Sequence, residues 1–239
     1  MSGPNHTVVD RSAWLAAQRD HLSNEKALTR HRDEVAAKRR ELPWLAITEP
    51  YEFIGPDGAV DLAELFGPHR QLVLWHFMYG ADWTEGCPSC SFWADSYNGT
   101  QEHLAARNTA LCAVSIAPYE AIAGYQQRMG WTFPWYSSAF SSFNVDLGVT
   151  FSAEQIEAGD AGYNFGTAPP HSPEAHGLSA FTRDDAGQVY LTYQTFSRGV
   201  DAMNSAYQML DLTAAGRDEA SLPWPMAWLR RHDEYAAEG

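Results

Sequence analysis

Cysteine is scarce in this chain, whose 239 residues contain only Cys87, Cys90 and Cys112. Secreted domains that depend on disulfides carry a denser and even-numbered set, so the sequence excludes a disulfide framework. No apolar run approaches the roughly 18 residues of a membrane-spanning helix. The opening MSGPNHTVVDRSAW has no basic stretch followed by an apolar one, so we expect no signal peptide. A reducing cytoplasm is the expected compartment.

Positive charge is also in short supply. Sixteen Lys and Arg stand against 30 Asp and Glu, which gives a net charge of −14 and a pI near 4.9. This balance argues against nucleic acid or an anionic membrane surface as a partner. The N-terminal segment does not share this excess of negative charge, because residues 1–42 carry eight Lys and Arg against six Asp and Glu.

Residues 12–42 contain neither Pro nor Gly and are rich in helix formers, which predicts one or two helices that end before Pro43. Leu28, Val35 and Leu42 recur every seven residues, but three positions are too few to predict a coiled coil. We therefore expect a helical arm over residues 1–42 with a cationic face. The arm would pack on its own acidic body or on a neighbouring subunit, which would give a homodimer; a solvated surface helix is the third alternative.

The most informative stretch is QLVLWHFMYGADWTEGCPSCSFWADSYN, which starts at Gln71. Its apolar first part predicts a buried strand over residues 71–78, and Pro88 suits the first position of a helix over residues 88–107. Cys87 and Cys90 would then lie one turn apart, close enough to bridge. The helix dipole and free N–H groups would favour a thiolate at Cys87. A strand followed by C-x-x-C at a helix start is the thioredoxin-like arrangement.

The rest of the pattern predicts an α/β fold. Residues 43–66 are expected to form two short extended pieces and a one-turn helix capped by Asp61. Beyond the helix that follows Cys87, we expect a strand over 109–116, a helix over 118–129, an extended segment over 131–137, hairpin strands over 177–181 and 188–193, and a helix over 199–210. Cys112 falls in an apolar run and is expected to be a buried hydrophobic residue. An inserted loop segment covers about 151–175. Residues 43–235 would thus form a thioredoxin-like three-layer sandwich with a mixed central sheet, in which two parallel strands join an antiparallel hairpin.

Longer motifs add a family resemblance. They are His76-Phe-Met-Tyr-Gly, Asp82-Trp, Glu85-Gly-Cys-Pro-Ser-Cys-Ser-Phe-Trp-Ala-Asp, Arg128-Met-Gly-Trp-Thr-Phe-Pro-Trp and Arg231-His-Asp-Glu-Tyr. Together they resemble the bacterial family catalogued as domain of unknown function 899, over about residues 12–235. That family is described as thioredoxin-like and as predicted dithiol–disulfide oxidoreductases. The resemblance implies this fold and this activity, without a cofactor.

A more distant resemblance is to thiol peroxidases of the peroxiredoxin type. Thr84 stands three residues before Cys87, as in their P-x-x-x-T-x-x-C motif, although Gly80 replaces the proline. The segment 130–138 is also similar to theirs. The resemblance adds Thr84 to the candidate catalytic residues.

Two departures from these relatives concern the segment before the hairpin. Peroxiredoxins use an Arg there to stabilise the reactive thiolate, whereas this chain has no Arg between Arg128 and Arg183 and carries His176 near the expected place. Thioredoxins have a cis-proline just before the hairpin, where this chain offers Gly177.

Thiol–disulfide exchange is the predicted mechanism: Cys87 attacks as a thiolate and Cys90 resolves the mixed disulfide. The substrate would be a thiol or disulfide, either a small molecule or a protein. Asp82 and Glu85 would oppose a negative charge on the sulfur, so we do not expect a very acidic thiol. His76, on the strand, could donate a proton, with a core histidine as the alternative.

Aromatic residues near the motif could line a substrate pocket, although core packing explains them equally well. The candidates are Trp83, Trp93, Trp131 and Trp135, together with His176.

A metal site is the main alternative. Thiolates of Cys87 and Cys90 could hold Cu(I) or Zn(II) with His76 or His176, or with His103 or His171. Such a site would suit a metallochaperone or a copper-dependent enzyme that activates oxygen. A non-catalytic interaction module that uses the arm is a third class.

Overall fold

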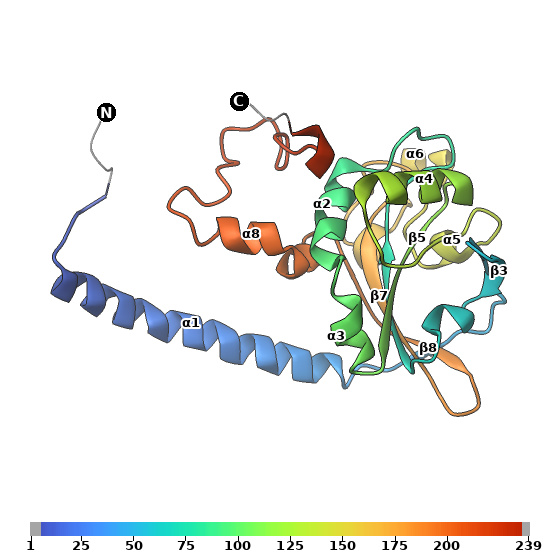
Figure 1. The fold of residues 1–239 in the computed structure, drawn as a ribbon, viewed down its shortest axis with the longest axis horizontal. Coiled ribbons are helices and arrows are strands. Elements are labelled where there is room, and N and C mark those ends of the chain that lie inside the picture. The colour runs from blue at the N-terminus through green and yellow to red at the C-terminus, as the bar shows by residue number, and fades with distance from the viewer. Residues whose placement is uncertain (1–5, 236–239) are drawn as a thin grey trace. The chain divides into compact units, whose positions relative to one another are not determined.

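A computed structural model describes residues 6–235 of the chain (Figure 1). The chain divides between Pro43 and Trp44 into two units. Across the described residues, no helix is both long and apolar enough to cross a membrane.

The N-terminal unit contains one long helix, α1 (Arg11–Arg39). Its start is fixed by Asp10, whose carboxylate accepts a hydrogen bond from the backbone N–H of Ala13 over 2.9 Å, a cap worth about 1 kcal/mol. The predicted helix is confirmed. None of its residues is buried, and Trp14 and Leu28 are about half exposed. Whether the helix packs on the acidic body, packs on a neighbouring subunit or stays solvated remains a prediction.

The second unit is built on one mixed sheet with the strand order β1-β8-β7-β4-β5-β6-β2-β3. Strands β4, β5 and β6 run parallel, and β7 and β8 form the antiparallel hairpin beside β4. Their bounds are β1 Leu45–Ala46, β2 Glu52–Gly55, β3 Gly58–Asp61, β4 Gln71–His76, β5 Thr109–Ser115, β6 Trp135–Ser137, β7 Gly177–Arg183 and β8 Val189–Phe196. The sequence predicted the parallel pair, the hairpin of β7 and β8, the two extended pieces that form β2 and β3, and the extended segment that contains β6; it did not predict β1 or that β6 runs parallel to β5.

Strand β4 separates two cores, because its successive side chains point to opposite faces of the sheet. Trp75 belongs to the core under α2 (Pro88–Tyr97) and α4 (Tyr119–Met129). Leu72 and Leu74 belong to the core on the other face, against η1 (Glu64–Phe66) and α5 (Phe143–Asp146). The protein is therefore an α/β three-layer sandwich of the thioredoxin-like type, as expected.

Two predicted helices are broken. The helix expected over 88–107 ends at Asn98, because Gly99 takes a left-handed φ of 85°, and α3 (Gln101–Ala105) follows. The helix expected over 199–210 is split into η2 (Ser197–Met203) and α8 (Ser205–Leu210). Asn204 divides them, since its side chain caps α8 by accepting from the N–H of Tyr207 over 2.9 Å.

The insertion has its own small core. It carries α6 (Ala153–Ala158) and the short irregular turn α7 (Tyr163–Gly166), and its apolar residues pack with Phe196 at the end of β8. Tyr163 fastens it: the hydroxyl donates to the carbonyl of His176 over 2.7 Å and accepts from the N–H of Ser197 over 2.9 Å. The last element of the described residues is η3 (His232–Glu234), which Figure 1 shows in dark red near the start of α2.

Candidate active site

The two cysteines of the motif are held by the end of strand β4. Cys87 is the N-cap residue of α2 and Pro88 is its first residue, as the sequence predicted. The backbone of Met78 reaches both cysteines: its carbonyl accepts from the N–H of Cys87 over 3.0 Å, and its N–H donates to Sγ of Cys90 over 3.4 Å. Cys87 is half-buried, Cys90 is 2% exposed, and both are free thiols.

The surroundings separate the two thiols in acidity. A hydrogen bond from Cys90 lowers the pKa of Cys87 to about 7, against the effect of burial and with help from the N–H groups of Ser89 and Cys90 and the charge of Arg231. Burial raises the pKa of Cys90 well above its ordinary value, and the hydrogen bond to Cys87 adds to this. At neutral pH the outer sulfur is therefore about half ionised, and the inner sulfur keeps its proton.

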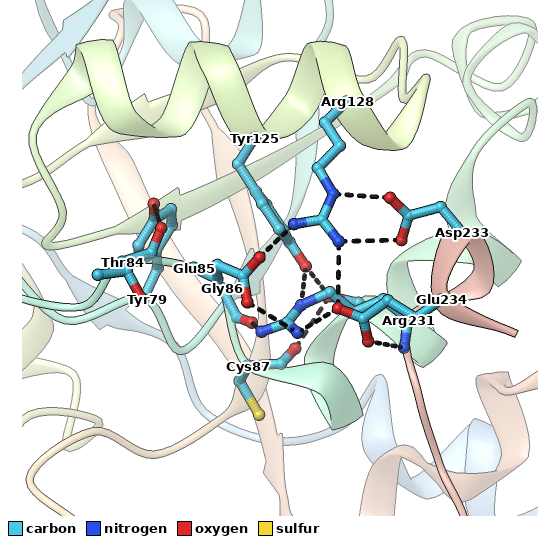
Figure 2. Close-up of polar contacts among 11 residues, drawn as sticks. Tyr79, Thr84, Glu85, Gly86, Cys87, Tyr125, Arg128, Arg231, Asp233 and Glu234 are labelled. Carbon is cyan, nitrogen blue, oxygen red and sulfur yellow. Dashed lines mark hydrogen bonds and ion pairs between the residues drawn. The ribbon is translucent and has the colours of Figure 1, made fainter.

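The C-terminal segment brings an arginine to this turn. Arg231 donates through Nη2 to the carbonyl of Gly86 and through Nε to the hydroxyl of Tyr125, both over 2.8 Å (Figure 2). Its Nη1 pairs with Glu234 at 2.8 Å and with Glu85 at 3.0 Å. Only 11% of this side chain is exposed, so the charge sits at the base of the motif rather than in solvent.

A second arginine completes an ion network above the first. Arg128, on α4, donates through Nε to Asp233 over 2.6 Å and through Nη2 to Glu234 over 3.1 Å, and it also pairs with Glu85. Figure 2 shows the three carboxylates surrounding the two guanidinium groups. The network ties α4, the C-terminal segment and the loop before Cys87 together.

This network modifies the reasoning behind one expectation, although a thiol with a pKa of about 7 is not very acidic and the expectation itself stands. Glu85 was expected to oppose a thiolate at Cys87, but its carboxylate is paired with both Arg128 and Arg231. The pKa of Cys87 is lowered, because paired carboxylates exert little net field and hydrogen bonds to the sulfur dominate. Asp82 is exposed on the same loop.

Several residues at the site were not singled out from the sequence as functional, among them Tyr125, Ser91 and Arg231. The hydroxyl of Tyr125 contacts Oγ of Ser91 at 2.8 Å, and Ser91 in turn donates to the carbonyl of Cys87 over 2.9 Å. Arg231 and Arg128 each open one of the motifs that carry the family resemblance, and this was the signal that could have found them.

His76 lies on the other face of the sheet from the cysteines. Its Nε2 shares a hydrogen bond of 2.7 Å with Oγ of Ser179, and its ring stacks on Phe143. Burial lowers the pKa of His76 to about 3. The structure does not bring His76 and the cysteines together, and its proposed part in catalysis stays a prediction.

His176 and Glu174 lead into strand β7, and Glu174 acts electrostatically on the inner cysteine. His176 is half-buried, with its ring near those of Trp75 and Trp93. Its pKa is lowered chiefly by burial. Glu174 is 4% exposed, and both of its oxygens accept from Oγ1 of Thr150 over 3.0 Å. Burial raises the pKa of Glu174 to about 8, and its carboxylate contributes to the raised pKa of Cys90.

The other predicted site residues divide into two groups. Trp83 and Thr84 line an open cavity of about 520 Å³ beside the loop that precedes Cys87. Thr84 is exposed, and its carbonyl accepts from the hydroxyl of Tyr79 over 3.3 Å.

Three of the predicted tryptophans lie in the core, each with its indole N–H paired. Trp93 donates to the carbonyl of Val200 over 2.9 Å, and Trp131 donates to Asp95 over 2.8 Å. Trp135 donates to Oγ of Ser115 over 3.0 Å. At most 5% of each is exposed, so packing accounts for their positions. A part in substrate binding stays a prediction for all four tryptophans.

The metal alternative finds no complete ligand set. Within residues 6–235, no three or more His, Cys, Asp or Glu side chains are grouped so that they could hold a metal ion. Cys87 and Cys90 are neighbours without a third such ligand from His76 or His176. Copper or zinc binding by the two thiolates stays a prediction.

Residues 3–235 match the family described as "Bacterial protein of unknown function (DUF899)". The chain belongs to the DUF899 family. This confirms the resemblance carried by the motifs, among them those that begin at Arg128 and Arg231. No curated protein matches the sequence.

Solved structures similar to this DUF899 protein include several peroxiredoxins. The peroxidoxin BcpB from Mycobacterium tuberculosis is 14% identical, with a TM-score of 0.45 over 68% of this chain and 94% of its own. A mutant PrxQ from Xylella fastidiosa is 10% identical, with a TM-score of 0.44 over 70% and 95%. Peroxiredoxin Q from Xanthomonas campestris is 12% identical, with a TM-score of 0.45 over 69% and 97%. None of these TM-scores reaches 0.5. The fold assignment therefore rests on the sheet topology described above and not on these similarities.

Proposed function

We propose that this DUF899 protein is a dithiol–disulfide oxidoreductase in which Cys87 is the nucleophile and Cys90 the resolving thiol. One observation carries the proposal. Two free thiols stand one turn apart at the start of α2, the outer with a lowered pKa and the inner buried with a raised pKa. A nucleophile that is partly ionised at neutral pH beside a protonated partner suits ordered exchange.

The exchange proceeds in two displacements. The thiolate of Cys87 attacks one sulfur of a substrate disulfide, and the other substrate sulfur leaves as a thiolate and takes a proton from water. Cys90 then loses its proton and attacks Sγ of Cys87, which expels the second substrate thiol and leaves a Cys87–Cys90 disulfide. The substrate gains two electrons and two protons, and an external dithiol must reduce the enzyme before the next cycle.

A second candidate activity is that of a thiol peroxidase. The partial burial of Cys87 favours it, because a half-buried sulfur is more accessible to a small hydroperoxide than to a disulfide on a protein surface. The thiolate would attack the outer peroxide oxygen and release an alcohol or water, which leaves a sulfenic acid on Cys87. Cys90 would then displace water from it to form the same disulfide.

The experiment uses four versions of the full chain: the wild type, Cys112→Ala, and two further variants that combine Cys112→Ala with Cys87→Ser or with Cys90→Ser. Cys112 lies buried in β5 and serves as the control thiol. With dithiothreitol as reductant, we would follow the reduction of oxidised glutathione and of insulin, and the consumption of hydrogen peroxide. Intact mass spectrometry would detect glutathione bound to the protein.

The proposal expects the wild type and Cys112→Ala to reduce a disulfide at the same rate. It expects Cys87→Ser to be inactive and Cys90→Ser to accumulate one bound glutathione. Disulfide reduction that persists in Cys87→Ser would overturn the assignment of the nucleophile. Rapid consumption of hydrogen peroxide without disulfide reduction would favour the thiol peroxidase activity over the disulfide oxidoreductase activity.

A further inference from the structure

Arg231 has a position that the exchange mechanism does not explain. Its guanidinium group is almost fully enclosed, and it comes from a segment 145 positions along the chain from Gly86. Yet Figure 2 shows Sγ of Cys87 pointing away from both arginines. The group therefore contacts the backbone that carries the nucleophile and not the reacting sulfur.

The peptide bond between Gly86 and Cys87 is held on both sides. Its carbonyl oxygen accepts from Nη2 of Arg231 over 2.8 Å, and its N–H donates to the carbonyl of Met78 over 3.0 Å. The first contact is charge-assisted and is therefore stronger than a bond between neutral groups. This fixes the rotation of the chain immediately before Cys87.

A second route runs from Arg231 to the carbonyl after the nucleophile. Nε of Arg231 donates to the hydroxyl of Tyr125 over 2.8 Å. Ser91 uses its only hydroxyl proton on the carbonyl of Cys87, so Tyr125 must be the donor in its 2.8 Å contact with Ser91. The chain Arg231–Tyr125–Ser91–Cys87 has one consistent direction, and such chains strengthen each member bond.

We infer that Arg231 is a positioning residue that orients Cys87 at the start of α2, by holding the carbonyl before it directly and the carbonyl after it through Tyr125 and Ser91. The inference rests on the proposed role of Cys87 as the nucleophile. It assigns a purpose to the C-terminal motif, whose other members secure the segment: His232 pairs with Asp95 at 2.8 Å and Asp233 with Arg128 at 2.6 Å.

Arg128 supplies a matched control. It belongs to the same ion network and pairs with the same two glutamates, but its polar contacts are with Glu85, Asp233 and Glu234 and not with the backbone around Cys87. Its side chain is 34% exposed, against 11% for Arg231. Removing either arginine takes one positive charge from the network, and only the loss of Arg231 releases the turn.

The test measures the rate at which Cys87 reacts with iodoacetamide as a function of pH, in the Cys112→Ala background. The charged and titratable groups around Cys87 are Cys90 from α2, Glu85 from the loop, Tyr125 and Arg128 from α4, and Arg231 and Glu234 from the C-terminal segment. The variants leave all of these in place except the residue under test. Alkylation reports on the thiolate alone, so it can succeed or fail independently of any disulfide-reductase activity.

We expect Arg231→Gln to slow alkylation at pH 7 about tenfold and to move the midpoint to higher pH. Arg231→Lys should recover less than half of this loss, because an ammonium group carries the charge but cannot span two acceptors as the planar guanidinium does. Arg128→Gln should change the rate less than about twofold, as exposed ion pairs contribute little.

Full recovery in Arg231→Lys would show that charge alone matters and would overturn the positioning role. An unchanged rate in Arg231→Gln, or an equal loss in Arg128→Gln, would overturn it as well. If the Arg231 variants do not fold, Tyr125→Phe carries the test. It breaks the second route with the arginine still present, and it should slow alkylation about threefold; no change would contradict the inference.

Discussion

The backbone N–H of Met78 donates to Sγ of Cys90 over 3.4 Å, while the carbonyl of the same residue accepts from the N–H of Cys87. Met78, two residues past the end of β4, thus fixes both cysteines against the sheet. The inner sulfur is enclosed and has a donor of its own. The outer sulfur depends on Cys90 for the hydrogen bond that stabilises its negative charge.

The first prediction follows from that dependence. Because the hydrogen bond from Cys90 is the largest cause of the lowered pKa of Cys87, Cys90→Ala should raise this pKa from about 7 toward its ordinary value of 9.0. A rise of one unit would leave roughly fivefold less thiolate at pH 7. The absorbance of the thiolate at ultraviolet wavelengths, followed as a function of pH, measures the change. Cys112→Ala is the control, and an unaltered midpoint in Cys90→Ala would contradict the prediction.

The position of the motif could be predicted from local sequence because its causes are local. An apolar run makes β4, Pro88 starts α2, and Cys87 and Cys90 are three residues apart. The hairpin of β7 and β8 was equally visible, since polar turn residues separate two extended runs. These elements are enough to specify the central part of a thioredoxin-like sheet.

The rest of the site depends on contacts between distant parts of the chain. The carbonyl of Gly86 receives its donor from Arg231, and nothing in the spacing of either motif predicts their contact. The side of the sheet on which His76 lies could also have been predicted from the sequence. Side chains alternate along a strand, so His76 shares a face with Leu74 and not with Trp75, which packs on the side of the cysteines.

The second prediction concerns the glycine that precedes the nucleophile. A Cβ at Gly86 would lie 2.7 Å from Cε1 of Phe77 and 2.8 Å from Cε1 of Tyr125. Both rings are buried, so Gly86→Ala must displace them and should destabilise the fold by about 1–3 kcal/mol. Chemical denaturation measures this loss.

Gly124→Ala is the matched control for Gly86→Ala. Gly124 is an exposed residue of α4, and a Cβ there meets nothing within 4 Å. Alanine should therefore stabilise the helix there, by up to about 1 kcal/mol. Equal effects from the two substitutions would show that the space around Gly86 is not restrictive.

The third prediction tests His76 through pH. Its folded pKa of about 3 lies below the ordinary value of 6.5, so the unfolded chain binds a proton more readily than the folded one. Stability should then fall as the pH drops below 6.5, by about 2 kcal/mol between pH 7 and pH 5. His76→Phe should lack this slope in denaturation experiments while the alkylation midpoint of Cys87 stays unchanged. A shift of that midpoint would instead support a catalytic part for His76.

The fourth prediction concerns metals. Zinc in proteins takes four ligands as a rule, and Cys87 and Cys90 supply only two with no third among the grouped side chains of residues 6–235. Protein purified without chelators should therefore contain less than about 0.1 zinc per chain. Both thiols should be accessible to titration after mild denaturation. One tightly held metal per chain, lost in Cys87→Ser and in His176→Ala, would favour the metal alternative over disulfide exchange.

The fifth prediction uses Glu174, whose pKa burial raises from 4.5 to about 8. Below pH 4.5 the carboxyl group is protonated in both states, and the full stability of the neutral form is present. As the pH rises, the unfolded chain ionises first, so stability is lost progressively up to pH 8, by on the order of 4 kcal/mol.

Glu174→Gln keeps an oxygen that can accept from Thr150 and cannot ionise. The stability of Glu174→Gln should therefore match that of the wild type near pH 5 and exceed it at pH 8. The ionisation of Cys87 contributes equally to the stability of both proteins. Glu157→Gln, at an exposed position of the same insertion, should follow the wild type throughout. A constant difference between wild type and Glu174→Gln across this range would mean that Glu174 is ionised in the folded protein, and its field on Cys90 would then be that of a full charge.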